Sequence, residues 1–373
     1  MKFLYGLLSF FSRTANLIAF ILLVVSGAAA RINPDYFWPL GLFGLAYPVI
    51  ALLNIFFIIS WILRKRFFFI YSLIGLFITY PQLKAQIALP FLQQKTEATA
   101  NVRIMSYNVR NFDLYNWSKN MTSRQSMMDT IVQYAPDILL FQEFYTDQDN
   151  FKNTEYLDSL GYRYHQIAIE LVKKEHNIWG VAIFSKYPII ESGELVRQQT
   201  PGPYGQFYNR SVYADVKINN RIVRIITVHL QSIYLANEDY NTIQELKEET
   251  QYHYQKIVPI IKKLGKAFVQ RGIQSAELKS FIESSPHPVI LGGDFNDTPA
   301  SYAYQQINQL LDDTFLEKGK GLGSTYNGII PFLRIDYIFK DNSFKTTGFK
   351  LIKNPNSDHF PIVADITIPV QDS

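Results

Sequence analysis

The chain has 373 residues, with 36 Lys and Arg against 32 Asp and Glu, and this length allows one large domain or two ordinary ones. The absence of cysteine excludes disulfides, zinc–thiolate sites and thiol nucleophiles. Residues 1–90 carry seven basic residues and one acid, which leaves 29 basic and 31 acidic residues in the remainder. A near-neutral remainder argues against a general nucleic-acid binder, which needs many Lys and Arg contacts to phosphates.

Three apolar segments precede residue 91. They predict a transmembrane helical region over 1–90 with about three spans, at 15–30, 37–63 and 67–88. The segment 37–63 would reach roughly 40 Å as a helix against a hydrocarbon core of about 30 Å, so it should tilt or kink at Pro48. Asn54 within it is expected to bond a neighbouring helix. The third segment spans only if it includes residues 81–90.

Basic residues predict the orientation of these spans. Lys2 and Arg13 precede the first segment, and Arg64-Lys65-Arg66 separates the second from the third. The positive-inside rule places both regions in the cytoplasm, and three spans then place residue 91 onward outside. We therefore expect a multi-pass protein of the cell (inner) membrane with an extracytoplasmic catalytic domain. The run SGAAA also fits the end of a signal peptide, whose cleavage would keep this topology, whereas failure of the third span would reverse it.

A linker at 91–100 precedes a domain predicted over 101–370. Short alternating or apolar runs bounded by turns predict strands at Val102–Asn108, Ile138–Gln142, Tyr162–Glu170, Trp179–Ser185, Ser211–Ile218, Ile222–His229, Val289–Gly292, Asp336–Phe339, Phe344–Leu351 and Ile362–Ile368. Helical patterns lie at Ser123–Ala135, Thr242–Leu264, Ser275–Ser284 and Ser301–Leu311. Many strands with few helices between them predict two packed sheets covered by helices.

The segment 288–299, PVILGGDFNDTP, places polar residues directly after an apolar strand that a glycine pair is expected to end. Successive side chains of an extended chain alternate, so Asp294 and Asn296 should face one side and Phe295 the other. The same residue types also form turns, and Asp297 is expected to cap a helix that begins just after it.

Polar residues recur at the ends of other predicted strands. Each one singly has an ordinary explanation as a turn, a solvated end, a core histidine or a cap. Six strand ends with such groups together indicate a shared site, formed by Asn108, Glu143, His229, Asp294 with Asn296, Arg334 with Asp336, and Asp358 with His359.

This ordered set resembles the endonuclease/exonuclease/phosphatase superfamily, the DNase-I-like fold, here as a membrane-anchored bacterial member. The resemblance covers about 270 residues, roughly 101–370, and the combination of GDFN with a later SDH is highly specific. It implies an α+β fold, a four-layer α/β/β/α sandwich of two mixed sheets with its active site at one edge. It also implies divalent-metal-dependent cleavage of a phosphoester.

The resemblance and the chemistry of the residues assign roles to eight side chains. Oxygen ligands for Mg²⁺ or Mn²⁺ are expected from Glu143, Asn108 and Asp358. His359 paired with Asp336 is the general base or the electrostatic partner of the attacked phosphate. Asp294 aligns or deprotonates the attacking water, and Asn296 and His229 donate hydrogen bonds to the phosphoryl oxygens. No acid partner can be assigned to His229.

The resulting hypothesis is a membrane-anchored, metal-dependent phosphoesterase whose partners are the lipid bilayer and a phosphate-ester substrate. That substrate is a lipid head group, a nucleic acid or a small ester, and anchoring with a near-neutral domain favours a phosphodiester other than long duplex DNA. The alternative is a catalytically silent membrane protein of the same fold that binds or senses a phosphate ligand. It predicts lost metal or base residues, yet all are present. A transporter is disfavoured because three segments with one amide make a poor pathway.

Overall fold

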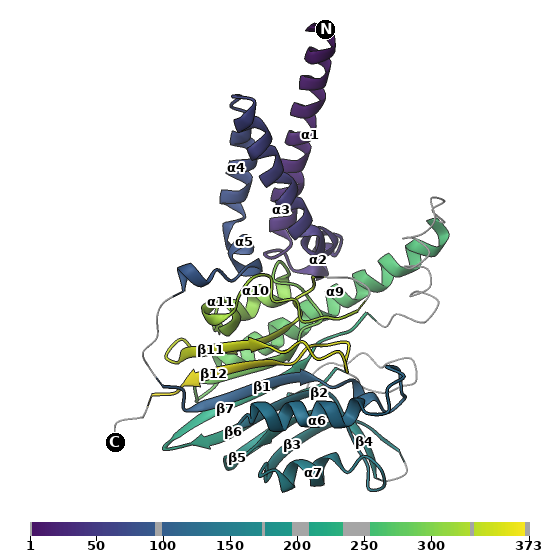
Figure 1. Cartoon of the computed structure of the whole chain (residues 1–373), viewed down its shortest axis with the longest axis vertical. Coiled ribbons are helices and arrows are strands. Elements are labelled where there is room, and N and C mark those ends of the chain that lie inside the picture. Colours follow the sequence, from purple (N-terminus) through teal and green to yellow (C-terminus); the bar gives the residue numbers. More distant parts are fainter. Residues whose placement is uncertain are drawn as a thin grey trace. The chain divides into compact units, whose positions relative to one another are not determined.

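The computed structural model describes residues 2–93, 99–173, 176–195, 209–233, 254–328 and 332–369 (Figure 1). The chain divides into two compact units. The first comprises Met1–Gln86, Ile233–Ile273 and Asp297–Gln305, and the second comprises Ile87–Ser232, Gln274–Asn296 and Gln306–Ser373. Parts of the predicted linker and of the predicted helix Thr242–Leu264 lie outside the described residues.

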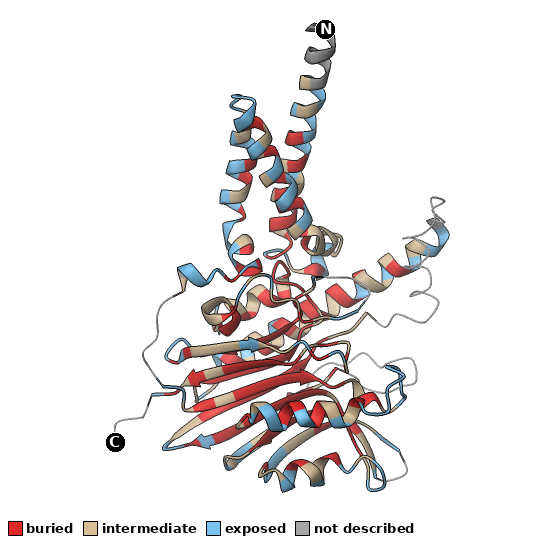
Figure 2. Ribbon diagram, viewed as in Figure 1, coloured by how far each residue is buried: buried red, intermediate tan, exposed pale blue. Residues whose placement is uncertain are grey.

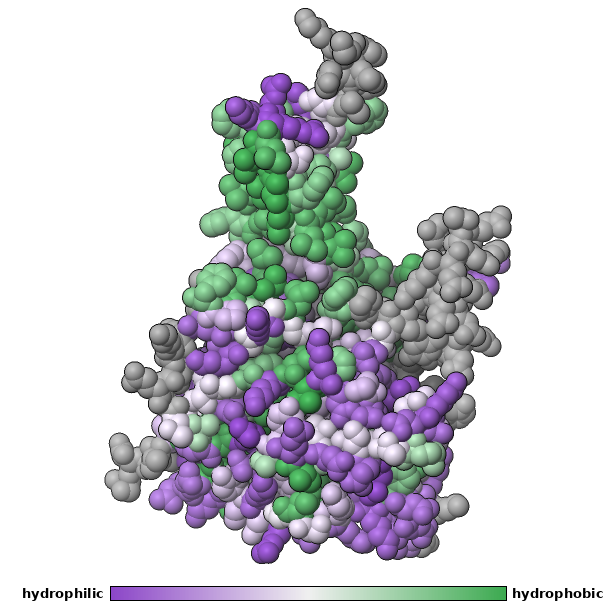
Figure 3. Space-filling model, viewed as in Figure 1, coloured by the Kyte–Doolittle hydropathy of each residue, from purple (hydrophilic) through white to green (hydrophobic). Residues whose placement is uncertain are grey.

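The first unit begins with apolar helices. They are α1 (Lys2–Ala28), α2 (Pro34–Phe37), α3 (Leu40–Leu63), α4 (Phe69–Ile78) and α5 (Tyr80–Gln86). Among the described residues, two helices are long and apolar enough to cross a membrane, Ser9–Ala28 and Leu40–Leu63, whereas α4 has ten residues. Figure 3 shows apolar side chains over the visible face of these helices.

Buried polar side chains join the apolar helices. Asn54 Nδ2 on α3 donates to the Ala19 carbonyl oxygen on α1 at 2.9 Å, as the sequence predicted. Ser72 Oγ on α4 donates to Asn16 Oδ1 on α1 at 2.6 Å. Such bonds between helices satisfy polar groups where water is absent, so they fix how the three helices pack.

The second unit contains two six-stranded sheets. The first has the order β11-β12-β1-β2-β4-β3 and the second has the order β5-β6-β7-β8-β10-β9. The strands of the first sheet are β1 (Val102–Asn108), β2 (Ile138–Thr146), β3 (Tyr164–Lys173), β4 (Asn177–Ser185), β11 (Lys345–Leu351) and β12 (Ile362–Thr367). Those of the second are β5 (Ile189–Glu194), β6 (Ser211–Ile218), β7 (Arg221–His229), β8 (Val289–Asp294), β9 (Asp312–Asp313) and β10 (Asp336–Lys340).

Each sheet has one parallel pair of strands at its centre. The pairs are β1 with β2 and β7 with β8, and every other pairing among the described strands is antiparallel. Both sheets are therefore mixed. In a parallel pair the two carboxyl ends lie at the same edge, so each sheet gathers strand ends at one place.

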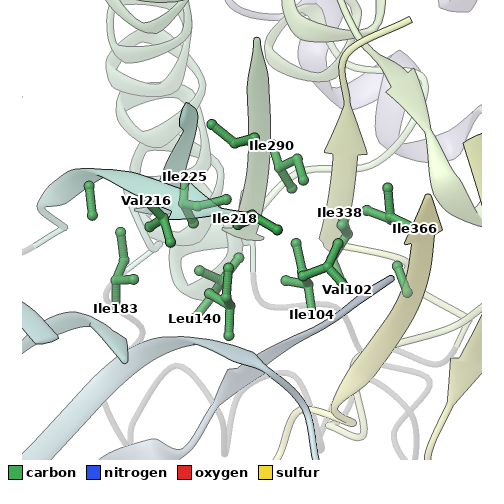
Figure 4. Packing of buried hydrophobic residues seen from close by; sticks show 14 of the residues in the cluster. Val102, Ile104, Leu140, Ile183, Val216, Ile218, Ile225, Ile290, Ile338 and Ile366 are labelled. Atoms are coloured by element: carbon green, nitrogen blue, oxygen red, sulfur yellow. The ribbon is translucent and has the colours of Figure 1, made fainter. Parts of the chain in front are cut away.

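The core lies between the two sheets. Ile, Val, Leu and Ala side chains from both sheets interdigitate there, as Figure 4 shows for β1 and β2 against β7, β8 and β10. Figure 2 shows the central strands of both sheets buried along most of their length, whereas the edge strands β3, β5 and β11 are mostly half-buried or exposed. The helices α6 (Ser123–Tyr134) and α7 (Asn153–Ser159) cover the outer face of the first sheet, where α6 buries Met127, Met128 and Ile131.

The outer face of the second sheet is also covered. Phe281, near the end of α9 (Tyr254–Glu283), contacts the Tyr213 ring of β6 with centroids 5.2 Å apart. Thr314 of α11 (Thr314–Lys318) donates its hydroxyl to the Ile338 carbonyl oxygen of β10 at 2.7 Å. The predicted α+β sandwich of four layers, α/β/β/α, is therefore confirmed.

Several predicted boundaries were wrong. The strands β5 and β9 were not predicted, and α10 (Tyr302–Asn308) is shorter than expected. The described part of α9 is one continuous helix through 265–274, where the sequence predicted a break. Two glycines in this stretch, Gly265 and Gly272, lie where α9 packs closely against its neighbours. A methyl group at Gly265 would be 2.7 Å from the Trp38 ring, and one at Gly272 would be 3.1 Å from Pro34.

The glycine pair after Leu291 does not end β8, which continues to Asp294. Gly293 has φ 143°, and a methyl group there would lie 2.1 Å from the Val228 carbonyl oxygen of β7. Only glycine allows β8 to approach β7 this closely. The two glycines therefore let β8 continue to its polar last residue, Asp294.

Candidate active site

The predicted site residues come together at one edge of the two sheets. Asn108, His229 and Asp294 end the strands β1, β7 and β8, and Glu143 lies in β2. Asp336 begins β10 directly opposite Asp294, because β10 runs antiparallel to β8. The carboxyl ends of the parallel strands and the amino end of the antiparallel strand β10 therefore lie at the same edge.

His359 and Asp336 form a buried pair. His359 Nδ1 lies 2.9 Å from Asp336 Oδ2 and 3.1 Å from Oδ1, and His359 Nε2 lies 3.6 Å from Asp294 Oδ2. The backbone N–H of His359 donates to Ser357 Oγ, and that hydroxyl donates to the Asn108 carbonyl oxygen at 2.8 Å. The segment before β12 is therefore tied to the end of β1.

The surroundings of His359 favour the imidazolium. Burial alone would lower the pKa of His359, but the carboxylates of Asp336, Asp294 and Asp358 outweigh it and hold the pKa well above its ordinary value. Asp336 also fixes the ring orientation, since it binds Nδ1 and leaves Nε2 directed at Asp294.

Asp294 is the centre of the hydrogen-bond network. Its Oδ1 accepts the Asn296 N–H at 2.8 Å, and its Oδ2 accepts Asn108 Nδ2 at 3.0 Å and lies 3.7 Å from His229 Nε2. Asn296 has a left-handed φ of 52° and donates its amide to the Leu230 carbonyl oxygen at 3.0 Å. Phe295 between them is fully buried, as the alternation predicted.

Glu143 occupies a strained position on β2. Its φ is 50°, and the pairing of β2 with β4 is irregular between Phe141 and Phe144. Such a bulge re-aims a side chain, and strained backbone of this kind is common at functional sites. Burial, aided by the carboxylate of Asp358, raises the pKa of Glu143 to about 7, and Asn108 Nδ2 donates to it at 3.3 Å.

Two further residues of the site were missed from the sequence. Arg110 Nε lies 3.4 Å from Asp358 Oδ2, and its guanidinium stacks on the Trp117 ring, 4.8 Å from the centroid. Glu170 accepts the backbone N–H of Arg210 at 3.1 Å, and burial raises the pKa of its carboxyl group while His229 opposes that rise. Glu170 is thus the acid near His229 that the sequence did not assign.

One predicted residue lies elsewhere. Arg334 NH1 pairs with Asp313 at 2.6 Å and its guanidinium stacks over Phe315, so it packs beneath α11. The ligand atoms of Asp294, Asp336 and His359 lie within 4.8 Å of one another, close enough to hold a metal ion. This set differs from the predicted ligands Glu143, Asn108 and Asp358.

A family model for the Endonuclease/Exonuclease/phosphatase family matches residues 105–359, and the chain belongs to this family, whose members hydrolyse phosphate esters. A second family, described as a domain of unknown function, matches residues 7–86. Sphingomyelinase C from Bacillus cereus is 27% identical over 157 residues, which cover 37% of this chain and 45% of that protein. The match thus spans less than half of that relative.

Two solved structures resemble this chain. The catalytic domain of human Nocturnin with a bound sulfate anion has a TM-score of 0.50 at 17% identity, with 75% of this chain and 98% of that chain covered. An endonuclease/exonuclease/phosphatase family protein from Leptotrichia buccalis has a TM-score of 0.49 at 18% identity, with 72% and 100% covered.

The site has the chemistry that a divalent cation requires. Members of the family generally use such a cation, and Mg²⁺ takes oxygen ligands. Here the Asn108 amide nitrogen lies between the carboxylates of Glu143 and Asp294. Burial is the main cause of the raised pKa of Glu143, and the carboxylates of Asp358 and Asp294 add to it, so the site concentrates acidic oxygens. The donor set therefore fits a hard cation.

We predict that Mg²⁺ binding at pH 6 releases a proton from Glu143. The metal-free carboxyl has a pKa of about 7, so it is mostly protonated below that pH, and a cation binds only the ionised form. At pH 8 the group is already ionised and the release should be small. Calorimetric titrations in two buffers of different ionisation enthalpy measure the proton count. Glu143→Gln should abolish the release and weaken binding, and a count that does not change between the two pH values would contradict the assignment.

Proposed function

We propose that the chain is a membrane-anchored, divalent-metal-dependent phosphoesterase. The observation that carries this proposal is the placing of His359 Nε2 beside Asp294 at 3.6 Å while Asp336 holds Nδ1. A carboxylate and an oriented imidazolium then face the space where a water and a phosphoryl group would meet. We favour a phosphodiester other than long duplex DNA, with a lipid head group, a nucleic acid or a small ester as the substrate.

The side chains divide the work of hydrolysis. Asp294 aligns the attacking water and takes its proton, and the His359 imidazolium stabilises the negative charge that develops on the phosphoryl oxygens. His359 thus acts as the electrostatic partner rather than the base, because its pKa is raised well above the ordinary value. The cation, held by Glu143, Asn108 and Asp358, would neutralise charge on the phosphate and orient it.

Two donors complete the phosphate site. The Asn296 amide nitrogen carries two hydrogens, one of which bonds the Leu230 carbonyl oxygen, so the second can reach a phosphoryl oxygen. His229 Nε2 lies 3.7 Å from Asp294 Oδ2, so it faces the same space and can donate to a phosphoryl oxygen.

The proposal is tested with a panel of phosphate esters: plasmid DNA, sphingomyelin, phosphatidylinositol phosphates and a chromogenic diester. Each is assayed with Mg²⁺, with Mn²⁺ and with EDTA. We expect turnover of at least one ester with Mg²⁺ or Mn²⁺ and loss of that turnover with EDTA. Turnover that persists in EDTA would exclude the metal-dependent mechanism, and no turnover of any ester would favour the silent binding protein.

We predict that His359→Ala lowers kcat by a factor of roughly 10² to 10³, the usual cost of removing one preorganised group that stabilises charge in the transition state. Asp336→Asn should cost less, because the imidazole stays in place. It should also move the alkaline limb of the kcat–pH profile to lower pH, since loss of the Asp336 carboxylate lowers the pKa of His359 and the imidazolium is then lost earlier as pH rises. A shift of the acidic limb instead would identify His359 as a neutral base.

We further propose that α4 and α5 form a third membrane span. Ser72 of α4 bonds Asn16, twelve residues before α1 ends at Ala28, and Gln82 Nε2 of α5 donates to the Gly27 carbonyl oxygen at 3.4 Å. The third segment therefore runs beside α1 to its carboxyl end. With Arg64-Lys65-Arg66 in the cytoplasm, three spans place the catalytic domain outside the cytoplasm.

Protease accessibility tests this topology. We expect protease added to right-side-out inner-membrane vesicles to digest the region from residue 101 onward, because three spans expose it on the outer side. The measurement is a blot against a C-terminal tag, with lysed vesicles as the control for protease susceptibility. Full protection in intact vesicles would place the domain in the cytoplasm and exclude the third span.

A further inference from the structure

The segment directly after the catalytic loop belongs to the unit of the N-terminal helices. Asp294 and Asn296 lie in the second unit, but residues 297–305 and the first part of α9, residues 254–273, group with the apolar helices. The peptide bond after Asn296 therefore leads directly from the proposed catalytic residues into the helical unit.

Asp297 is held by a buried arginine of α9. Asp297 Oδ2 lies 2.9 Å from Arg271 Nε, and the Arg271 side chain is 1% exposed. Asp297 Oδ1 accepts the neighbouring Thr298 N–H at 3.0 Å, and α10 begins only at Tyr302, so the predicted helix cap was wrong. Removing one partner of a buried pair leaves an uncompensated charge, so this pair fixes where residue 297 lies.

Residues after Asp297 pack directly among the apolar helices. Ala300 is fully buried in a cluster with Leu23 of α1 and Tyr47 of α3. A methyl group at Gly44 of α3 would lie 3.2 Å from the Ala300 carbonyl oxygen and 2.9 Å from Ala29 Cβ. There is thus no spare room between α3 and this segment.

The turn of α9 that contains Arg271 also packs against α2 and α3. The Arg271 guanidinium stacks over Phe268, and a methyl group at Gly41, near the start of α3, would lie 2.5 Å from that ring. Gly272, next in sequence, packs against Pro34. Contacts therefore run from α3 through Phe268 and Arg271 to Asp297.

We propose that Arg271 and Asp297 are positioning residues for the proposed catalytic loop, Asp294 to Asn296. The Arg271–Asp297 pair and the buried Ala300 hold the chain immediately after Asn296. The pair acts on Asp294 and Asn296 through the peptide bond that joins Asn296 to Asp297. This inference rests on the proposed phosphoesterase function.

The first test compares two buried carboxylates in the full chain reconstituted in lipid. Asp297→Asn should lower kcat toward a chromogenic phosphodiester by about 10²-fold, the cost of a small misplacement of reacting groups, with Mg²⁺ affinity unchanged. Asp215→Asn is the matched control, because Asp215 also binds a buried arginine, Arg224, through two bonds of 2.7 Å. It should lower the melting temperature similarly and leave kcat unchanged. Equal kcat losses in the two variants, or none in Asp297→Asn, would overturn the proposal.

The conservative arginine variant separates positioning from general stability. Arg271→Lys retains the charge and should recover most of the kcat that Arg271→Met loses, at equal melting temperature. Identical kcat values for these two variants would show that the charge on residue 271 does not position the loop.

The second test perturbs the helices themselves. Gly44→Ala pushes on the Ala300 backbone and should lower kcat. Gly193→Ala, on β5, is the control because its methyl group would meet the Tyr213 side chain at 2.9 Å, away from Ala300. If Gly44→Ala has the kcat of Gly193→Ala, the helices do not hold the loop.

Hydrogen exchange decides the question even if the unaltered chain hydrolyses no ester, which would reject the proposed function. The Asn296 N–H is held by Asp294 Oδ1 at 2.8 Å, so its exchange reports the loop geometry. The peptide that covers residues 289–297 should exchange faster in Asp297→Asn than in Asp215→Asn. Equal exchange would overturn the positioning role.

Discussion

The register of three strands around Asp294 is the constraint on which the site depends. Asp294 is paired with His229 across the parallel strand β7 and with Asp336 across the antiparallel strand β10. A slip of one residue would turn every one of these side chains to the opposite face. Gly293 protects the register, because any side chain there would strike the Val228 carbonyl oxygen and force the strands apart. The chemistry of the site therefore begins with a backbone contact.

Electrostatic crowding is the second property of this edge. Four carboxylates, those of Glu143, Asp294, Asp336 and Asp358, act on one another and on His359 within a largely buried region. Such an arrangement stabilises a bound cation and the imidazolium. It lowers the stability of the folded protein without a cation, because the carboxylates repel one another, as is common at functional sites. The strained φ of Glu143 is a further sign of that compromise.

Local alternation in the sequence predicted the strands well, and prediction failed where distant segments meet. Every predicted strand formed, and Asn108, His229 and Asp294 end strands because apolar runs mark where strands lie, whereas Glu143 lies inside β2, which continues to Thr146. The approach of Glu170 to His229 depends on how two sheets are stacked, which no local pattern encodes. Arg271 likewise meets Asp297 only through tertiary packing.

The predicted helix boundaries were wrong because tertiary packing overrode local helix propensity. The sequence predicted two helices separated at 265–274, a stretch that contains Gly265, and glycine has low helix propensity. The close approach to Trp38 gives that glycine a packing role within one continuous helix. Local propensity is a weak guide wherever a helix is held by its neighbours. The strands, whose alternation reports burial directly, were the safer prediction.

The pairing of β1 with β12 has a consequence for how the chain is made. Val102 lies opposite Ile366, and Asn101 bonds Ile368 across 267 residues of sequence. Closing so long a loop is entropically costly, and folds rich in such distant pairings form slowly. The first sheet stays open at β1 until β12 has been synthesised, and His359 arrives with it. A growing chain therefore emerges with the polar residues of this site still apart, and they come together only after β12 has been made.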